Sequence, residues 1–191
     1  MSDHYVEDQQ FEGVSFSKDG FRSGHYQDCF FVRCDLSGVD LSHSIFEDVR
    51  FDQCNLTGVR TEETAFRNVK FVDTKLLGID WSPVRAMFLE MHFCDCQLDL
   101  SSFYGCSLEL SSFRRCSLRE VDFVNTNLSG VALLDCNLQD AQFESTNMKG
   151  ADLTGAHNYI INPEINVLNG DKVSWPAASG LLHQYDLKWG D

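Results

Sequence analysis

The chain has 191 residues, of which 29 are acidic and 15 are basic, so its formal net charge is −14. Direct binding to nucleic acid needs the opposite sign, and this class of function is therefore disfavoured. No stretch approaches the roughly 18 consecutive apolar residues of a membrane helix, and the acidic opening segment MSDHYVEDQQ does not have the apolar core of a signal peptide.

Residues 1–10 are predicted to form an N-terminal cap segment, and a five-residue repeat begins after them. Every fifth residue is then apolar, apart from Thr61, and the residue two places before it is small. Neither an α-helix, with about 3.6 residues per turn, nor a straight strand, with a period of about two, gives a constant apolar face at this spacing. Each pentad is therefore expected to be a short extended segment followed by a corner, with its central residue facing inward. The centres of the first run are Phe11, Phe16, Phe21, Tyr26, Phe31, Leu36, Leu41, Phe46, Phe51, Leu56, Thr61, Phe66, Phe71, Leu76 and Trp81.

Two features of the first run depart from the regular pattern. Phe30 is adjacent to a centre and is expected to point outward, either for packing at an end or as a contact site. Glu62 and Glu63 follow the polar centre Thr61 and are expected to form a local negative corner.

The repeat is interrupted near residues 82–87. Trp81 and Phe88 are seven positions apart instead of five, so two residues are inserted. A bulged corner and a small projecting contact that carries Arg85 are both compatible with this insertion. The candidate loop residues are Ser82, Pro83, Val84 and Arg85. The centres of the second run are Phe88, Phe93, Leu98, Phe103, Leu108, Phe113, Leu118, Phe123, Leu128, Leu133, Leu138, Phe143, Met148 and Leu153, which places the repeat region at residues 11–155.

A longer period of 20 residues is contained in the short one. It separates successive members of two sets of residues, Gly38, Gly58 and Gly78, and Cys96, Cys116 and Cys136. Four pentads per turn would stack such residues in columns. Pentads such as Cys34-Asp35-Leu36-Ser37-Gly38 and Gly150-Ala151-Asp152-Leu153-Thr154 resemble those of the pentapeptide-repeat family. The resemblance implies an all-β repeat solenoid, a right-handed quadrilateral β-helix with a filled interior.

The cysteines are predicted to be buried, reduced thiols and not a disulfide framework. Seven of the eight occupy the small inward position of a pentad, and only Cys94 lies outside it. Reduced cysteines without an export signal predict a cytoplasmic location. The histidines are scattered, and no nucleophile elbow or phosphate-binding loop is present, so we expect no enzyme activity, metal or cofactor.

Residues 156–191 are predicted to be a C-terminal capping or dimerisation segment. Pro176 is a suitable first residue for a short helix that ends near Gln184. The apolar residues of this segment suggest that it covers its own rod or pairs with a second copy. The candidate dimerisation residues are Leu181, Leu182, Tyr185, Leu187 and Trp189. The segment also resembles the tail of the Qnr-type quinolone-resistance and microcin- and albicidin-immunity subset, which implies a homodimer formed through the C-terminus.

The surplus of acidic residues lies outside the apolar repeat positions and is therefore expected on the surface. A narrow rod with regularly spaced carboxylates is similar to duplex DNA in shape and sign. The resemblance to the subset implies binding to DNA gyrase or topoisomerase IV and protection of the enzyme from quinolones or natural gyrase poisons. Self-immunity next to a toxin gene cluster would use the same mechanism. The candidate contact residues are Asp35, Asp40, Glu47, Asp48, Asp52, Asp135, Asp140, Glu144 and Asp152. The alternative is a structural or scaffolding rod with another protein partner.

Overall fold

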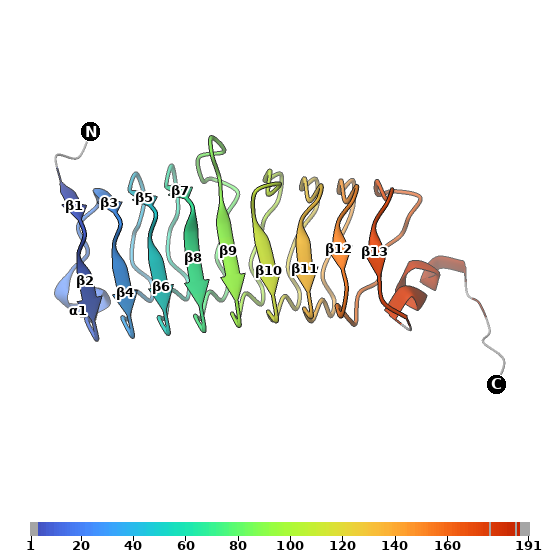
Figure 1. Cartoon of the computed structure of the whole chain (residues 1–191), viewed down its shortest axis with the longest axis horizontal. Coiled ribbons are helices and arrows are strands. Elements are labelled where there is room, and N and C mark those ends of the chain that lie inside the picture. The colour runs from blue at the N-terminus through green and yellow to red at the C-terminus, as the bar shows by residue number, and fades with distance from the viewer. Residues whose placement is uncertain (1–3, 176, 186, 188–191) are drawn as a thin grey trace.

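The computed structural model describes residues 4–175, 177–185 and 187, and in it the chain winds into a rod of stacked turns (Figure 1). Every strand pair is parallel, and equivalent residues in neighbouring turns are normally 20 apart, as in the pairs Phe31–Phe51 and Phe51–Phe71. The predicted all-β repeat solenoid is thus confirmed. The elements are β1 (Tyr5–Glu7), β2 (Gln10–Glu12), α1 (Phe16–Asp19), β3 (His25–Gln27), β4 (Phe30–Val32), β5 (Ile45–Glu47), β6 (Arg50–Asp52), β7 (Ala65–Arg67), β8 (Val69–Val72), β9 (Met91–Cys94), β10 (Ser112–Arg114), β11 (Ala132–Leu134), β12 (Asp152–Leu153), β13 (Lys172–Val173), and the 3-10 helices η1 (Ala177–Leu181) and η2 (His183–Tyr185).

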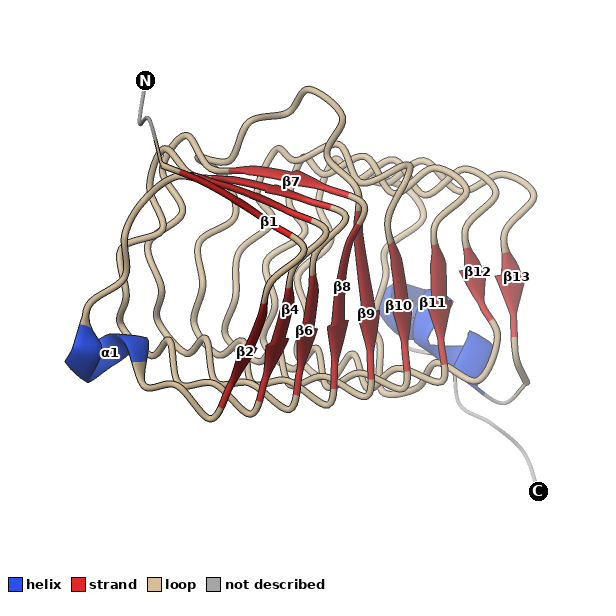
Figure 2. Cartoon of the chain, turned by 60° about the vertical axis from the view of Figure 1, so that its left-hand side comes forward, coloured by secondary structure: helices blue, strands red, loops and turns tan. Residues whose placement is uncertain are grey.

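The rod has four sides, which we number in the order in which the chain passes them. Side 1 contains the four-stranded sheet β1-β3-β5-β7, and side 2 contains the nine-stranded sheet that runs from β2 to β13 (Figure 2). Sides 3 and 4 have isolated parallel bridges, such as Asp35 with Asn55 on side 3 and Asp40 with Arg60 on side 4. After β7, side 1 continues with bridges of the same kind.

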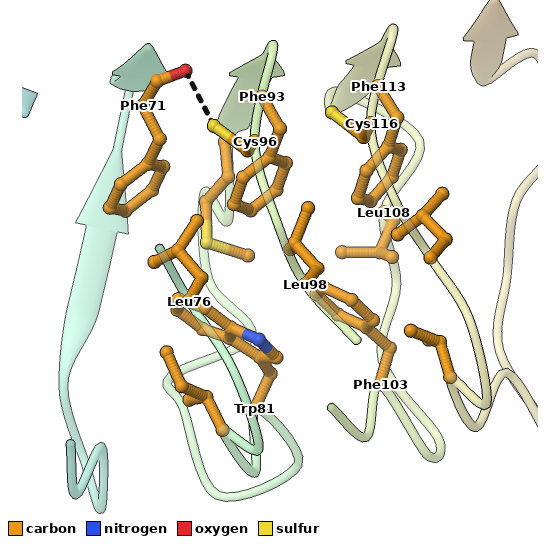
Figure 3. Packing of buried hydrophobic residues seen from close by; sticks show 14 of the residues in the cluster. Phe71, Leu76, Trp81, Phe93, Cys96, Leu98, Phe103, Leu108, Phe113 and Cys116 are labelled. Atoms are coloured by element: carbon orange, nitrogen blue, oxygen red, sulfur yellow. Dashed lines mark hydrogen bonds between the residues drawn. The ribbon is translucent and has the colours of Figure 1, made fainter. Parts of the chain in front are cut away.

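The interior is filled by columns of like residues, as the 20-residue period predicts. Behind side 2, the rings of Phe71, Phe93 and Phe113 are stacked with centroids 5.0 and 4.9 Å apart (Figure 3). Such offset ring stacks add to the free energy gained by apolar burial. The polar centre Thr61 is also buried, because its hydroxyl donates to the Asp80 carbonyl at 2.6 Å.

The backbone conformation at the corners of the rod explains why glycine recurs every 20 residues. Gly38, Gly58 and Gly78 have φ values of 66°, 64° and 63°, in the left-handed region where a residue without Cβ meets no steric penalty. The equivalent corner positions of side 1 are occupied by Asp28 and Asp48, at φ 50° and 54°. Aspartate tolerates this conformation better than most residues, so the corners also bring carboxylates to the surface.

The insertion lies further along the chain than the sequence indicates. Arg85 remains in register, because its N–H donates to the Thr64 carbonyl at 2.9 Å just as the Ala65 N–H donates to the Ser44 carbonyl at 2.9 Å, and Val84 is buried. The extra residues project from side 1 at Ala86–Phe88, directly after the ladder of that side ends at β7 (Figure 1). The prediction that Phe88 is an inward centre is wrong. This side chain is 67% exposed, and the buried Leu89 fills the interior.

The predicted boundaries at both ends also differ from those of the rod. Within residues 1–10, β1 already pairs with β3, so this segment belongs to the first turn. At the other end the turns continue past residue 155, since Asn147 bridges Val167 and β12 pairs with β13. In this last turn Leu168 packs against the core. The small inward position before it is occupied by the buried Asn166, whose side chain donates to the Phe143 carbonyl at 3.0 Å and accepts from the Thr146 N–H at 2.9 Å.

The C-terminal segment covers the end of the rod. The expected helix from Pro176 to about Gln184 is present as the two 3-10 helices η1 and η2, and Pro176 lies outside the described residues. Leu181 packs against the hydrophobic core, and the Ile161 N–H donates to the Gly180 carbonyl at 3.2 Å. A side chain at Gly180 would collide with the Tyr159 carbonyl, so glycine permits this close approach.

Candidate acidic interaction surface

The net negative charge is unevenly distributed among the four sides. On side 2, the strands and the corner residue after each of them carry six acidic and six basic side chains, so this face is neutral. The acidic residues there are Glu12, Asp52, Asp73, Asp95, Asp135 and Asp152, and the basic residues are Arg33, Arg50, Lys70, Arg114, Arg115 and Lys172. Many of them are paired between neighbouring turns, as in the contacts of Arg115 with Asp95 at 2.6 Å and Lys172 with Asp152 at 3.0 Å. Such pairs hold turns together but leave little net field.

Side 4, in contrast, is strongly acidic, with seven acidic and two basic side chains along the rod. The basic residues are Arg22 and Arg60. Arg60 forms an ion pair with Asp40 at 2.7 Å, and Glu63 is 3.4 Å from Arg85. The other carboxylates of this side have no ion pair among the described residues. The acidic residues of side 4 are Asp40, Glu62, Glu63, Asp80, Asp122, Glu144 and Glu164. We call this set the side 4 acidic face.

Local hydrogen bonds explain why aspartate recurs one place before a centre. The carboxylates of Asp40, Asp80 and Asp122 accept the backbone N–H two residues later, at 3.0, 2.9 and 2.8 Å. This is the Asx-type contact by which Asp and Asn stabilise turns. The side-chain hydrogen bond from Ser42 is the main cause that lowers the pKa of Asp40. The same arrangement with Ser37 lowers the pKa of Asp35, so these carboxylates stay ionised at neutral pH.

The N-terminal half of side 1 is also acidic. Asp8, Asp28 and Asp48 occupy the same corner in three successive turns, because their N–H groups donate in turn to the carbonyls of Gln27, Glu47 and Arg67. None of the three carboxylates has a basic partner among the described residues. Glu47 beside them is 3.1 Å from His25 and 3.6 Å from Arg67.

The nine predicted contact residues are not brought together on one surface. Asp40 and Glu144 lie on side 4, and Glu47 and Asp48 lie on side 1. The others are on the remaining sides: Asp35 and Asp140 on side 3, and Asp52, Asp135 and Asp152 on side 2. The sequence reasoning did not select Asp80, Asp122 and Glu164, which belong to the side 4 acidic face. Assigning each acidic residue to its column, with a spacing of 22 across the insertion, would have identified them.

The predicted loop and tail residues have different surroundings. Of the loop residues, Arg85 contacts Glu63 and Val84 is buried, whereas the side chains that project are those of Met87 and Phe88. In the tail, Leu182 and Leu187 line a cavity of about 900 Å³ together with His157 and Tyr159. Tyr185 donates to Glu164 at 3.2 Å. Trp189 lies outside the described residues, and Trp175, which was not predicted, is 76% exposed.

The described residues offer no arrangement suited to metal chemistry. Within residues 4–175, 177–185 and 187, no three His, Cys, Asp or Glu side chains are grouped so that they could hold a metal ion. In the same part of the chain, no helix is both long and apolar enough to cross a membrane. The eight cysteines are all free thiols, and seven of them are buried as predicted.

Comparison with known proteins agrees with this architecture. A family model described as a pentapeptide repeat region matches residues 6–81 and 96–161. Among solved structures, a trypsin-treated variant of QnrB1, described as a plasmid-mediated fluoroquinolone resistance protein, is 16% identical with a TM-score of 0.59, over 98% of this chain and 99% of that one. HetL of the cyanobacterium Nostoc sp. strain PCC 7120, involved in heterocyst differentiation regulation, is 14% identical with a TM-score of 0.50, over 87% of this chain and 84% of that one. No match was found among curated proteins. At these identities the structural likeness shows the fold alone.

Proposed function

Because the chain belongs to the pentapeptide-repeat family, we propose that it acts as a DNA-mimicking rod that binds a type II topoisomerase, DNA gyrase or topoisomerase IV. Binding would protect the enzyme from quinolones or from natural gyrase poisons. The observation that carries this proposal is the side 4 acidic face, which extends from Asp40 to Glu164 along the rod. A basic channel made for DNA would attract this face and not the neutral side 2.

The spacing of the charges supports competition with DNA. Side 4 provides roughly one carboxylate per turn, and successive turns of a β-helix are about 4.8 Å apart. A single DNA strand carries a phosphate about every 3.4 Å. The acidic face therefore has a somewhat lower charge density than one DNA strand, with the same sign and a similar repeat. Such a surface would occupy the channel by electrostatic complementarity, which mainly increases the rate of association.

Exposed apolar side chains at the C-terminal end support a symmetric dimer formed there. Large apolar side chains exposed together on a monomer commonly mark a protein interface. Those of the last turn and the tail are Ile160, Ile165, Val167, Val173, Trp175, Tyr185 and Leu187. Two copies joined through these residues would present one acidic rod on each side of the two-fold axis, which suits a topoisomerase that is itself two-fold symmetric.

The proposal is tested with purified gyrase in a supercoiling assay, with and without ciprofloxacin or albicidin, at two salt concentrations. Rescue of the poisoned reaction that weakens at the higher salt concentration would establish protection, because salt screens contacts between exposed charges. Inhibition without rescue would establish binding to gyrase but contradict protection. The absence of any effect would contradict the topoisomerase proposal and favour a structural rod with another partner.

A further inference from the structure

The N-terminal end of the rod differs from the C-terminal end, because no described residues lie across its core as η1 and η2 do at the other end. The inward side chains of the first turn are only partly buried, whereas those of the second turn are buried. Phe11 shows the difference: one face of its ring is stacked on Phe31, with centroids 4.8 Å apart, and no turn among residues 4–175 lies on the other face. The partly buried residues of this end are Val6, Phe11, Val14, Phe16 and Phe21.

The first turn also has two open sheet edges. β1 is the last strand of the side 1 sheet and β2 is the last strand of the side 2 sheet, and both lie next to each other at one corner (Figure 2). On side 3 Ser15 bridges Asp35 and the short helix α1 follows, so the edge strands of this turn lie on sides 1 and 2. An edge strand presents unpaired N–H and C=O groups that can pair with another extended chain.

The repeat shows which backbone groups of β2 point away from the rod. In the next turns, the N–H of Phe30 donates to the Gln9 carbonyl at 2.9 Å and the N–H of Arg50 donates to the Cys29 carbonyl at 3.0 Å. The first residue of each strand thus donates towards the preceding turn, and the described residues contain no such acceptor for the Gln10 N–H. Similarly, the Val32 carbonyl accepts from Gly13 of the preceding turn, so the equivalent Glu12 carbonyl faces outward.

The charge around these edges determines the kind of partner. Glu7, Asp8 and Glu12 lie on β1, on β2 or between them, and Asp28 continues the corner in the second turn. Only Glu12 of these four has a basic partner among the described residues, Arg33. A second copy of the same end would be repelled by its own carboxylates, and the C-terminal end of another copy is covered by its tail. A basic chain would be attracted.

We propose that the N-terminal end of the rod binds an extended, basic segment of a partner protein, which adds a strand to β2. Its backbone would accept from the Gln10 N–H and donate to the Glu12 carbonyl. An apolar side chain of the segment would cover the exposed face of the Phe11 ring, and basic side chains on either side would approach Glu7 and Asp8. This interface is separate from the side 4 acidic face and does not depend on topoisomerase binding.

The test uses the full chain and a fluorescein-labelled heptapeptide of alternating lysine and valine with phenylalanine at its centre, followed by fluorescence anisotropy. We expect saturable binding of one peptide per chain that weakens with salt. A peptide with the same residues but with an N-methylated amide at the residue two places after the phenylalanine, the one that would donate to the Glu12 carbonyl, should bind about tenfold more weakly, because the strand contact is lost. Equal binding of both peptides would overturn the proposal.

Two variants locate the peptide on the rod. Gln10→Pro removes an N–H that faces outward, which edge strands tolerate, and should weaken binding about tenfold with an unchanged melting temperature. Asp8→Lys should also weaken binding, whereas the matched reversal Asp140→Lys on side 3, in a distant turn, should not. Equal weakening by Asp8→Lys and Asp140→Lys would mean attraction to overall charge only and would overturn the proposal even if Gln10→Pro does not fold.

Discussion

Trp81 and Phe103 lie with their ring planes 2° apart and their ring centroids 5.8 Å apart, although 22 residues separate them (Figure 3). In the turns before the insertion, residues that stack on each other are 20 positions apart, as Phe51 and Phe71 are. The two additional residues therefore leave the chain on side 1 without disturbing the column behind side 4. An insertion in a solenoid is tolerated where it can project into solvent, because each turn contacts only its neighbours.

Trp81 is fully buried, and its indole N–H has no hydrogen-bond partner among the described residues. Trp81→Phe keeps a stacked ring and removes the unsatisfied donor, whose burial costs about 1–3 kcal/mol. We therefore expect its free energy of unfolding to be within about 1 kcal/mol of that of the wild type, whereas Trp81→Ala should lose about 3–5 kcal/mol through the cavity it leaves. Urea unfolding measures both, and similar losses in the two variants would contradict this account.

Removal of Ala86 and Met87 should restore a regular pentad. Phe88 would then follow Trp81 by five positions, with Val84 two places before it, and would turn inward in place of Leu89. We expect a folded rod at least as stable as the wild type, because an exposed loop is exchanged for buried apolar area. Thermal unfolding compares the stability of the deletion variant with that of the wild type. The exposure of residue 88 can be measured by thiol labelling of Phe88→Cys, made once in the wild-type chain and once in the deletion variant. A deletion variant that unfolds would show that the insertion is needed for the coil.

Stability at low pH should depend on Asp95. Its two carboxylate oxygens accept from Nε and Nη2 of Arg115 at 2.7 and 2.6 Å, and this contact lowers the pKa of Asp95 from 3.8 to about 2. A depressed pKa in the folded state stabilises the protein above the unfolded-state value, and this contribution is lost as the pH falls through about 2.

The advantage of the wild type over Asp95→Asn should therefore be fully present above about pH 4 and disappear below about pH 2. Denaturant unfolding at a series of pH values measures the difference. Arg115→Gln should abolish the same pH-dependent component, and its persistence in that variant would assign it to another group.

Native thiol labelling should report the burial of the cysteines. Cys94 is the only cysteine that is not buried, and burial together with Asp95 raises its pKa, so it should react slowly with iodoacetamide at neutral pH. Burial raises the pKa of both Cys54 and Cys106 to about 12, and these thiols should react only after unfolding. Mass spectrometry of the labelled protein identifies the sites, and Cys94→Ser should abolish native labelling. Rapid native labelling of Cys116 would contradict the closed core.

Charge reversal should separate side 4 from side 2 in topoisomerase binding. The double variant Glu62→Lys and Glu144→Lys changes two exposed residues of the side 4 acidic face, and the matched control Asp73→Lys and Asp135→Lys makes the same change of net charge on side 2. We expect the first to raise the concentration needed for an effect on gyrase by about tenfold, and the second to change it little. The supercoiling assay measures this, and equal effects would show that only net charge matters.

Much of the fold was predictable because the pentad places an apolar group in the interior at every fifth residue. Phe71, Phe93 and Phe113 were assigned to the core from their spacing alone, and the structure stacks their rings. Phe30 was expected to point outward and does so. Phe88 was misplaced because a seven-residue gap does not show which of the intervening residues leave the column. Leu89 and Phe88 are both apolar, and only packing selects between them.

The candidate surface was less predictable than the core. Asp40 and Asp52 look equivalent in the sequence, since each lies next to an inward centre. In the structure they are on different sides, Asp40 within the side 4 acidic face and Asp52 beside Arg50 on the neutral side 2, at 2.7 Å. Many of the ion pairs join residues in neighbouring turns, which are 20 positions apart, as in Arg60 with Asp40, or 22 positions apart across the insertion, as in Arg85 with Glu63.

The sequence by itself determined the repeat, the inward columns and the excess of negative charge, because a period of five allows one way of burying the apolar residues. The tertiary structure decided where the charge is concentrated, which residues of the insertion project, and how each end of the rod is finished. These features depend on contacts between neighbouring turns and on the packing of the tail against Tyr159 and Ile161. A pattern of residue types does not contain such contacts, since they arise only when the turns are stacked.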